Sequence, residues 1–261
     1  MNQQTLNEVR NWFDDYVNRY CQGNGRLHPM LQLKFDHSLR VAVDSRKIAS
    51  ALGWPDKDVG TAEAIGILHD VGRFPQFAKF GTFFDPDSVN HGECGYGVAG
   101  ESKVLASCSP KNREVILNGI RYHNCRVIPT ELEPESLRFL KLIRDADKLD
   151  IFYVLSDAIR NKRFVEHPEL LLNANPKGPA NPRLLQEIRE QRSGSYKNID
   201  SLIDMNLLQV TWVYGINYSP TFHCIAERRL LEGIRAVMPN DPEIQEVITA
   251  AREFVADKLS A

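Results

Sequence analysis

Apolar residues recur at helical spacing along most of the chain, and glycine, proline and capping residues divide this pattern into segments. The stretch His37 to Leu52 contains no glycine or proline, and Gly53 and Pro55, which follow it, are typical of a helix end. A second helix is expected over residues 56–70, whose apolar run ends in an adjacent histidine and aspartate. The pattern therefore predicts two consecutive helices early in the chain.

Three further helices are expected downstream. One begins near His91, and the next has Ser109 as its cap and Pro110 at its first position. The longest and most periodic runs from Pro134 to about Leu155. Together with the first two, these segments predict a protein built mainly of helices.

Two segments interrupt the helical pattern. Residues 71–90 are dense in glycine, proline and aromatic residues and are expected to form an ordered loop. Residues 207–216, "LLQVTWVYGI", are β-branched enough to leave a strand open there. No clear hairpin is visible, so the expected fold is an all-α helical bundle. We expect a single domain over residues 1–261, with a metal-site core at about 25–160 and a C-terminal helical extension at about 181–261 packed on it.

Composition is that of an ordinary soluble globular protein. The 261 residues are 43% hydrophobic and 25% charged. The 32 basic and 34 acidic residues leave a net charge of −2, which gives no reason to expect nucleic acid or an anionic membrane as a partner. No stretch approaches the ~18 continuous apolar residues needed to cross a bilayer. We therefore expect a cytoplasmic protein whose partner is a small molecule.

Cysteine usage argues against a disulfide framework or a zinc site made of thiolates. The five cysteines are odd in number and scattered, and none forms a CxxC pair. They are expected to be reduced. Any metal site in this chain should therefore use histidine and carboxylate ligands.

The helix that starts at Pro134 carries two aspartates that point in different directions. At ~100° per residue, Asp147 lies within about 40° of four apolar positions, Leu140, Ile143, Ile151 and Val154. Asp145 falls on the opposite side of the helix. Asp147 is therefore the aspartate expected to point into the core.

The same construction directs histidines inward from three other helices. His37 shares a helix face with Val41 and Ile48, His91 with Gly95 and Val98, and His123 with Ile116 and Ile120. Burying several imidazoles and carboxylates without compensation is costly, because an isolated buried charge costs several kcal/mol. A bound cation removes this difficulty, and Fe, Mn or Zn sites use these two kinds of ligand.

These residues resemble a known family. A lone His37, the adjacent pair His69 and Asp70, and Asp147 in "ADKLD" are similar to the H…HD…D signature of the HD-superfamily metal-dependent phosphohydrolases. The resemblance covers about His37 to Val154. It implies an all-α fold in which His37, His69, Asp70 and Asp147 bind one metal ion.

The additional His91 and His123 resemble the six-ligand subset of this family, which holds two metal ions. The resemblance implies that Asp70 bridges to a second ion, completed by these two histidines. One or two divalent transition-metal ions are expected, with Fe or Mn favoured and Zn, Ni, Co or Mg as alternatives. A helix N-terminal role for His91 and a surface position for His123 are the competing interpretations.

The expected chemistry follows from the metals. A water between two divalent ions loses a proton near neutral pH, while the ions polarise a phosphoryl oxygen. Asp70, Arg73 and Lys148 are the expected catalytic residues, the last two as phosphate contacts. Each of these two basic residues has a solvated surface charge as its alternative interpretation.

Three functions remain open at this point. The leading hypothesis is a phosphomonoesterase or phosphodiesterase that acts on a nucleotide or another small phosphorylated metabolite. The alternatives are a mixed-valent di-iron oxygenase of the HD type and a non-catalytic module that binds metal or nucleotide. The chain lacks the signatures of the cyclic-dinucleotide and alarmone branches. Aromatic residues of the 71–90 segment are expected either to wall a pocket or to anchor the loop: Phe74, Phe77, Phe80, Phe83 and Phe84.

Overall fold

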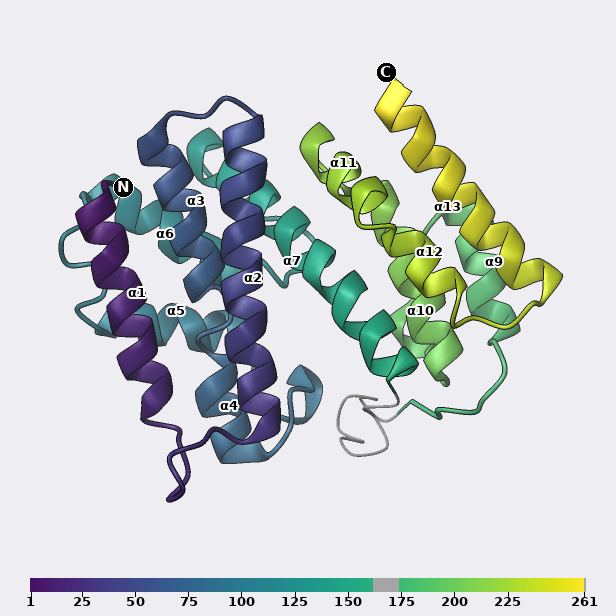
Figure 1. Cartoon of the computed structure of the whole chain (residues 1–261), viewed down its shortest axis with the longest axis horizontal. Helices are drawn as coiled ribbons and strands as arrows, with labels where there is room; N and C mark the ends of the chain where they lie inside the picture. Colours follow the sequence, from purple (N-terminus) through teal and green to yellow (C-terminus); the bar gives the residue numbers. More distant parts are fainter. Residues whose placement is uncertain (162–173, 261) are drawn as a thin grey trace. The chain divides into compact units, whose positions relative to one another are not determined.

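The computed structural model describes residues 1–161 and 174–260. Regular structure in this part of the chain is helical, and its one β-type pairing is an isolated bridge between Asn175 and Ser201 (Figure 1). The prediction of an all-α fold is therefore confirmed. None of the helices in these two ranges has the length and apolar character that crossing a membrane requires.

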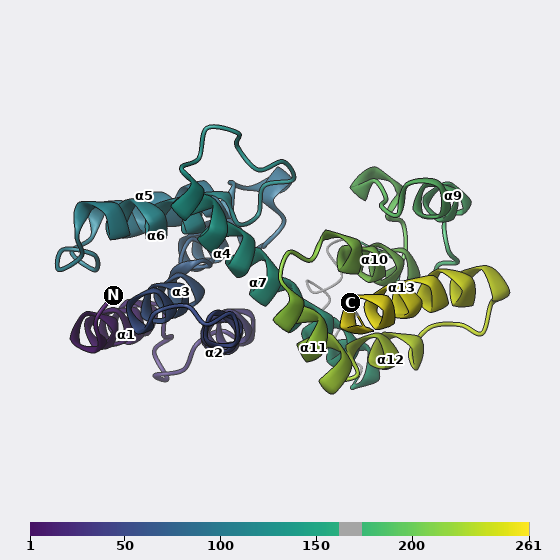
Figure 2. The same cartoon turned by 90° about the horizontal axis from the view of Figure 1, so that it is seen from above.

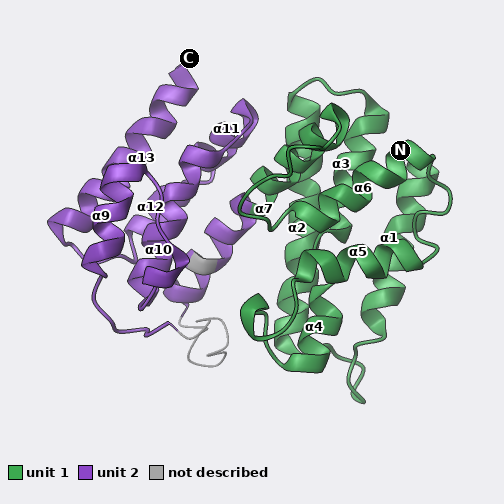
Figure 3. Ribbon diagram, turned by 180° about the vertical axis from the view of Figure 1, so that it is seen from behind, with its two compact units in different colours: residues 1–147 green, residues 148–261 purple. Residues whose placement is uncertain are grey.

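The chain divides into two compact units, Met1–Asp147 and Lys148–Ala261, and the boundary falls within one long helix (Figure 3). We describe each unit by itself. The first unit holds α1 (Gln3–Asn18), α2 (Pro29–Ala51), α3 (Asp56–Leu68), α4 (Arg73–Phe80), η1 (Asp85–Asp87), α5 (His91–Glu101), α6 (Pro110–Tyr122) and the first part of α7 (Pro134–Arg160).

Within the first unit, α3 lies between α1 and α2 (Figures 1 and 2). Its residues are buried from Asp58 to Leu68, which fits a central helix covered on several sides. Gly66 allows the close approach to α2, because a Cβ there would lie 2.5 Å from the Cα of Ala42. The C-terminal end of α3 is thereby held against α2.

A second layer of the first unit consists of α5 and α6, which pack on each other, and α6 also contacts α3 (Figure 2). Ser109 caps α6 as predicted, since its side chain accepts a hydrogen bond from the backbone N–H of Asn112. Gly72 lets the turn after α3 approach α5, because a Cβ there would collide with the carbonyl oxygen of His91. The start of α5 therefore lies against the end of α3.

The helix α2 begins two turns earlier than the predicted start at His37. Pro29 occupies its first turn, where a missing N–H removes no hydrogen bond, and the ring of His28 accepts from the N–H of Met30 at 3.3 Å. The longer helix places Lys34 one turn before His37.

The prediction of a loop over residues 71–90 is wrong in its first part, because Arg73–Phe80 forms the helix α4. Pro75 is its third residue, a position whose N–H has no partner within the helix. Gly81 ends α4 with a φ of 67°, which glycine adopts without strain. Only the stretch between α4 and α5 remains irregular, with the short η1 inside it.

The second unit is also helical, including the segment where a strand had been left open. Residues 207–216 lie at the end of α10 and in η4, where tertiary packing overrides the β-propensity of the valines. The helix α13 packs against α9, α10, η4, α11 and α12. The elements of this unit are the rest of α7, α9 (Pro182–Gln191), η3 (Tyr196–Asn198), α10 (Leu202–Val210), η4 (Thr211–Gly215), α11 (Ser219–Glu227), α12 (Leu230–Arg235) and α13 (Pro242–Ser260). That the C-terminal extension packs on the metal-site core stays a prediction.

Candidate metal centre

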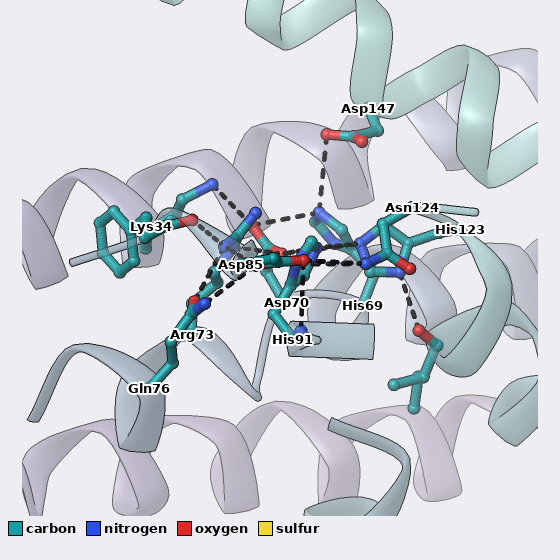
Figure 4. Close-up of polar contacts among 12 residues, drawn as sticks. Lys34, His69, Asp70, Arg73, Gln76, Asp85, His91, His123, Asn124 and Asp147 are labelled. Atoms are coloured by element: carbon teal, nitrogen blue, oxygen red, sulfur yellow. Dashed lines mark hydrogen bonds and ion pairs between the residues drawn. The ribbon is translucent and has the colours of Figure 1, made fainter. Parts of the chain in front are cut away.

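The six residues expected as ligands come together in the first unit. Their side chains are buried except for that of Asp147, which is 19% exposed. Ligand atoms of these residues form three overlapping groups, each within 4.8 Å (Figure 4). The residues come from different helices: His37 from α2, His69 and Asp70 directly after α3, His91 from the first position of α5, His123 directly after α6, and Asp147 from α7.

A first group forms around one oxygen of Asp70, and we define it as His37, His69, Asp147 and Asp70 Oδ2. The Nε2 atoms of His37 and His69 lie 3.2 Å apart. Asp147 Oδ1 lies 3.1 Å from His37 Nε2 and 3.8 Å from His69 Nε2. Asp70 Oδ2 lies 3.5 Å and 3.7 Å from the same two nitrogens.

A second group forms around the other oxygen of the same carboxylate, and we define it as His91, His123 and Asp70 Oδ1. The two Nε2 atoms lie 3.0 Å apart, and Asp70 Oδ1 lies 3.5 Å from the first and 3.6 Å from the second. Each oxygen of Asp70 therefore faces a different pair of imidazole nitrogens.

The tautomers of three rings follow from what their Nδ1 atoms contact. His69 Nδ1 lies 2.8 Å from the carbonyl oxygen of Gly66, and His123 Nδ1 lies 2.8 Å from that of Ile120. A carbonyl oxygen only accepts, so each Nδ1 carries the hydrogen. In a neutral ring, Nε2 then presents a lone pair toward the centre of the site. His91 has the same arrangement, with its Nδ1 2.7 Å from a carboxylate oxygen.

This donor set fits a cation. The Nε2 atoms of His91 and His123 face each other at 3.0 Å, and two ring lone pairs at that distance repel unless a proton or a metal ion lies between them. Two nitrogens bound to one ion at ~2.1 Å and roughly at right angles would lie about 3.0 Å apart. Imidazole and carboxylate donors without thiolates suit Fe, Mn or Zn.

Burial and charge set the protonation states of the site. Burial lowers the pKa of His69 to about 4 and that of His91 to about 3, so both rings are neutral near pH 7. Burial alone would raise the pKa of Asp70, but Lys34 and the neighbouring imidazoles outweigh it and hold that pKa well below its usual range. The pKa of Asp147 is likewise lowered, because His37 and His69 outweigh its burial. Neutral rings and ionised carboxylates are the states in which these residues bind metals.

Sequence reasoning missed Asp85, which lies between α4 and α5. Its carboxylate contacts His91 Nδ1 at 2.7 Å and accepts from Arg73 at 2.8 Å, from Gln76 at 2.9 Å and from Asn124 at 3.3 Å. The imidazole and Arg73 outweigh burial and lower the pKa of Asp85, which is therefore ionised. The only local signal was an aspartate in a glycine- and aromatic-rich segment six residues before His91.

Lys34 was also missed. Its Nζ donates to Asp70 Oδ2 at 2.9 Å, and its side chain is 15% exposed. The sequence offered a signal, because positions 34 and 37 share a helix face. That signal depends on a helix that begins before Lys34, and the predicted helix began at His37.

The two basic residues expected as phosphate contacts have different surroundings. One nitrogen of Arg73 donates to Gln76, to the carbonyl of Phe83 and to Asp85, while its Nε lies 3.5 Å from Asp70 Oδ1. Lys148 donates to the carbonyl of Gly215 at 2.9 Å, within the second unit. Arg73 thus contacts the site residues, and the phosphate contact of Lys148 stays a prediction.

The expected aromatic residues divide between core and site. Phe74 is buried and packs against Phe13 and Tyr16. Phe83 lies beside the metal centre, with the cationic groups of Lys34 and Arg73 5.5 Å and 5.6 Å from its ring centroid. Anchoring is therefore the role of Phe74, whereas Phe83 borders the site.

A helical fold whose histidines and aspartates meet in this way defines a metal-binding domain of the histidine–aspartate type. Residues 35–151 match the model of the HD domain family, and this segment holds all six expected ligands. This segment of the chain is therefore similar to an HD domain, which confirms the resemblance read from the sequence. Comparisons with curated proteins and with solved structures gave no match.

Proposed function

We propose that this protein is a metal-dependent phosphohydrolase that acts on a nucleotide or another small phosphorylated metabolite. The observation that carries the proposal is the carboxylate of Asp70, whose two oxygens face two separate pairs of imidazole nitrogens. In this proposal the six residues hold two divalent ions, with Fe or Mn favoured. A shared carboxylate brings two ions close enough to act on one phosphoryl group.

When bound, such ions supply Lewis acidity, which lowers the pKa of water and polarises a phosphoryl oxygen. In the hydrolysis itself, the water oxygen bonds to phosphorus, the ester P–O bond breaks, and the water proton ends on the leaving oxygen. The residues of this chain position the reactants. Asp70 and Asp147 supply fixed negative charge, and the backbone carbonyls behind His69 and His123 orient those rings.

In this account Arg73 acts mainly on the site residues. It contacts both Asp70 and Asp85 and thereby fixes the carboxylate behind His91. A direct phosphate contact remains part of the proposal for Arg73 and for Lys148. A cytoplasmic location and the absence of a nucleic-acid partner are likewise proposals.

The test combines metal analysis with an activity screen. We expect purified wild-type protein to hold close to two transition-metal ions per chain. It should release phosphate or a phosphomonoester from some member of a nucleotide panel, with or without oxygen. Asp70→Ala should lose both metal and activity, because Asp70 faces both groups. The control is Asp87→Ala, which removes an exposed aspartate of η1 and should leave both intact.

Three results would contradict the proposal. The site would be assigned to an oxygenase if no member of the nucleotide panel were hydrolysed, if turnover required oxygen, and if the protein showed a mixed-valent iron signal. Hydrolysis that survives Asp70→Ala undiminished would remove the metal centre from the reaction. Metal binding without turnover in either assay would favour a binding module.

A further inference from the structure

Two cationic side chains border Asp70, one on each of its oxygens. Lys34 donates to Oδ2 at 2.9 Å, and Arg73 Nε lies 3.5 Å from Oδ1. Both cations also lie near the ring of Phe83, as given above. Lys34 and Arg73 thus partly neutralise the carboxylate in the metal-free protein.

Both cations keep hydrogen-bond donors for a ligand. Nη1 of Arg73 already has three acceptors, whereas its buried Nε has no hydrogen-bond partner among the described residues and lies 3.5 Å from Asp70 Oδ1. An ammonium group has three hydrogens, and within residues 1–161 and 174–260 Asp70 is the one hydrogen-bond acceptor of Lys34. Since the Lys34 side chain is 15% exposed, it keeps donors for a molecule that enters the site.

The charges described above point to the class of ligand. Two divalent ions with Lys34 and Arg73 carry six positive charges, whereas three ionised carboxylates carry three negative ones: Asp70, Asp85 and Asp147. An excess of three positive charges in a largely buried site is unfavourable. A hydroxide together with a phosphomonoester dianion neutralises this excess, whereas a phosphodiester monoanion leaves one charge uncompensated.

We propose that Lys34 and the face of Phe83 form an oxyanion subsite beside Asp70 that binds the dianionic phosphoryl group of a phosphomonoester. This inference rests on the proposed function and makes its substrate class specific. The ammonium of Lys34 contacts a phosphoryl oxygen, and the Phe83 ring positions the ammonium through its cation–π contact. Lys34 is thereby a substrate-binding residue and not a metal ligand.

The experiment measures anion binding apart from turnover. Metal-loaded wild-type protein is titrated with methyl phosphate, a dianion at pH 8, and with dimethyl phosphate, a monoanion, by calorimetry. We expect the dianion to bind more tightly. Lys34→Met should weaken methyl phosphate binding roughly 10- to 100-fold, as loss of a charged hydrogen bond does, and should narrow the difference between the two anions. Lys34→Arg should retain most of the binding.

Metal content provides a second measurement. Removing a cation that contacts Asp70 should leave the metal affinity of Lys34→Met unchanged or raised. The matched control is Lys79→Met, which removes an exposed lysine that lies over another phenylalanine ring, that of Phe80, at 5.1 Å. This control should change neither metal nor anion binding.

Several outcomes would overturn the subsite. Unchanged methyl phosphate binding in Lys34→Met would do so, as would equal binding of the two anions by the wild type. Loss of metal in Lys34→Met would assign the lysine to the metal centre instead. A wild type that hydrolyses only diesters would refute the subsite while the proposed hydrolysis stands. A wild type that binds no metal would refute the proposed function itself.

Discussion

The two groups of the candidate metal centre contain similar residues, which are supported differently by their surroundings. His69 and His123 each follow the end of a helix, and each ring donates to the carbonyl three residues earlier in its own helix. The matching contacts place one imidazole in each group with the help of backbone alone. His91, the other imidazole of the second group, depends on the side chain of Asp85.

The two groups also differ in negative charge. Asp147 Oδ1 lies 3.1 Å from His37 Nε2 in the first group, and its carboxylate also lies within 4.8 Å of a ring nitrogen of His123 in the second group. Asp147 is therefore nearest to the first group, where it adds a second carboxylate to one oxygen of Asp70. An additional carboxylate strengthens the binding of a divalent cation. We therefore expect the first group to bind its ion more tightly. We expect metal binding by the second group to be sensitive to changes in the segment between α4 and α5.

The largest effect is expected from Asp147, the carboxylate that lies 3.1 Å from His37 in the first group. Asp147→Ala should remove about one ion per chain, because His37 and His69 then keep only the shared oxygen of Asp70 as an anionic partner. Metal quantification after dialysis measures this loss. Asp145→Ala is the comparison. Asp145 is buried two residues away on the other side of α7, so its loss should lower thermal stability and leave the metal content nearly intact. The reverse order would assign the ligand role to Asp145.

A smaller effect, confined to the second group, is expected from Asp85→Asn. An amide in place of the carboxylate removes the charge that fixes the His91 tautomer, and such changes typically weaken metal binding about 10- to 100-fold. Stepwise metal titration should show weaker binding of one ion and unchanged binding of the other. Asp87→Asn, an exposed change in the same short helix, should alter neither step. Equal weakening of both ions in Asp85→Asn would show that the groups are not supported separately.

The smallest effect is expected just outside the second group. Arg121 lies two residues before His123 and pairs with Glu93 at 2.8 Å, in an exposed contact. Exposed ion pairs contribute about 0–1 kcal/mol to stability. Arg121→Met should therefore shift the melting temperature by no more than a few degrees and leave both metal-binding steps unchanged. Loss of a bound ion in Arg121→Met would contradict this prediction and would show that the surface pair of Arg121 and Glu93 supports the second group.

The sequence by itself determined the all-α class, most helix positions and the six residues that meet at the centre. Helical periodicity is a local property, so it identified Asp147 as the inward aspartate and Asp145 as its opposite without any tertiary information. His37, His91 and His123 were found in the same way, because each continues an apolar helix face. The resemblance to the HD family then ordered them into one set.

The sequence pattern gave wrong helix boundaries where proline and aromatic residues are compatible with either a loop or the first turn of a helix. Pro75 and the phenylalanines of residues 71–90 read as a loop, yet Pro75 is tolerated in the first turn of α4. In the same way, Pro29 starts α2 earlier than predicted, and this brings Lys34 onto the helix of His37. Sequence gives element boundaries less reliably than element types. The first turn of α4 and the early start of α2 are both such boundaries.

Only the tertiary structure decided how the two oxygens of Asp70 are divided between the two groups, and which residues contact the outer nitrogens of the imidazole rings. The direction of its two oxygens depends on α2, α5, α6 and α7 approaching the end of α3, and on close contacts such as that of Gly72 with the start of α5. Asp85 reaches His91 only because the segment after α4 folds back onto α5. Such contacts join residues whose spacing in the chain carries no period, so no sequence pattern records them.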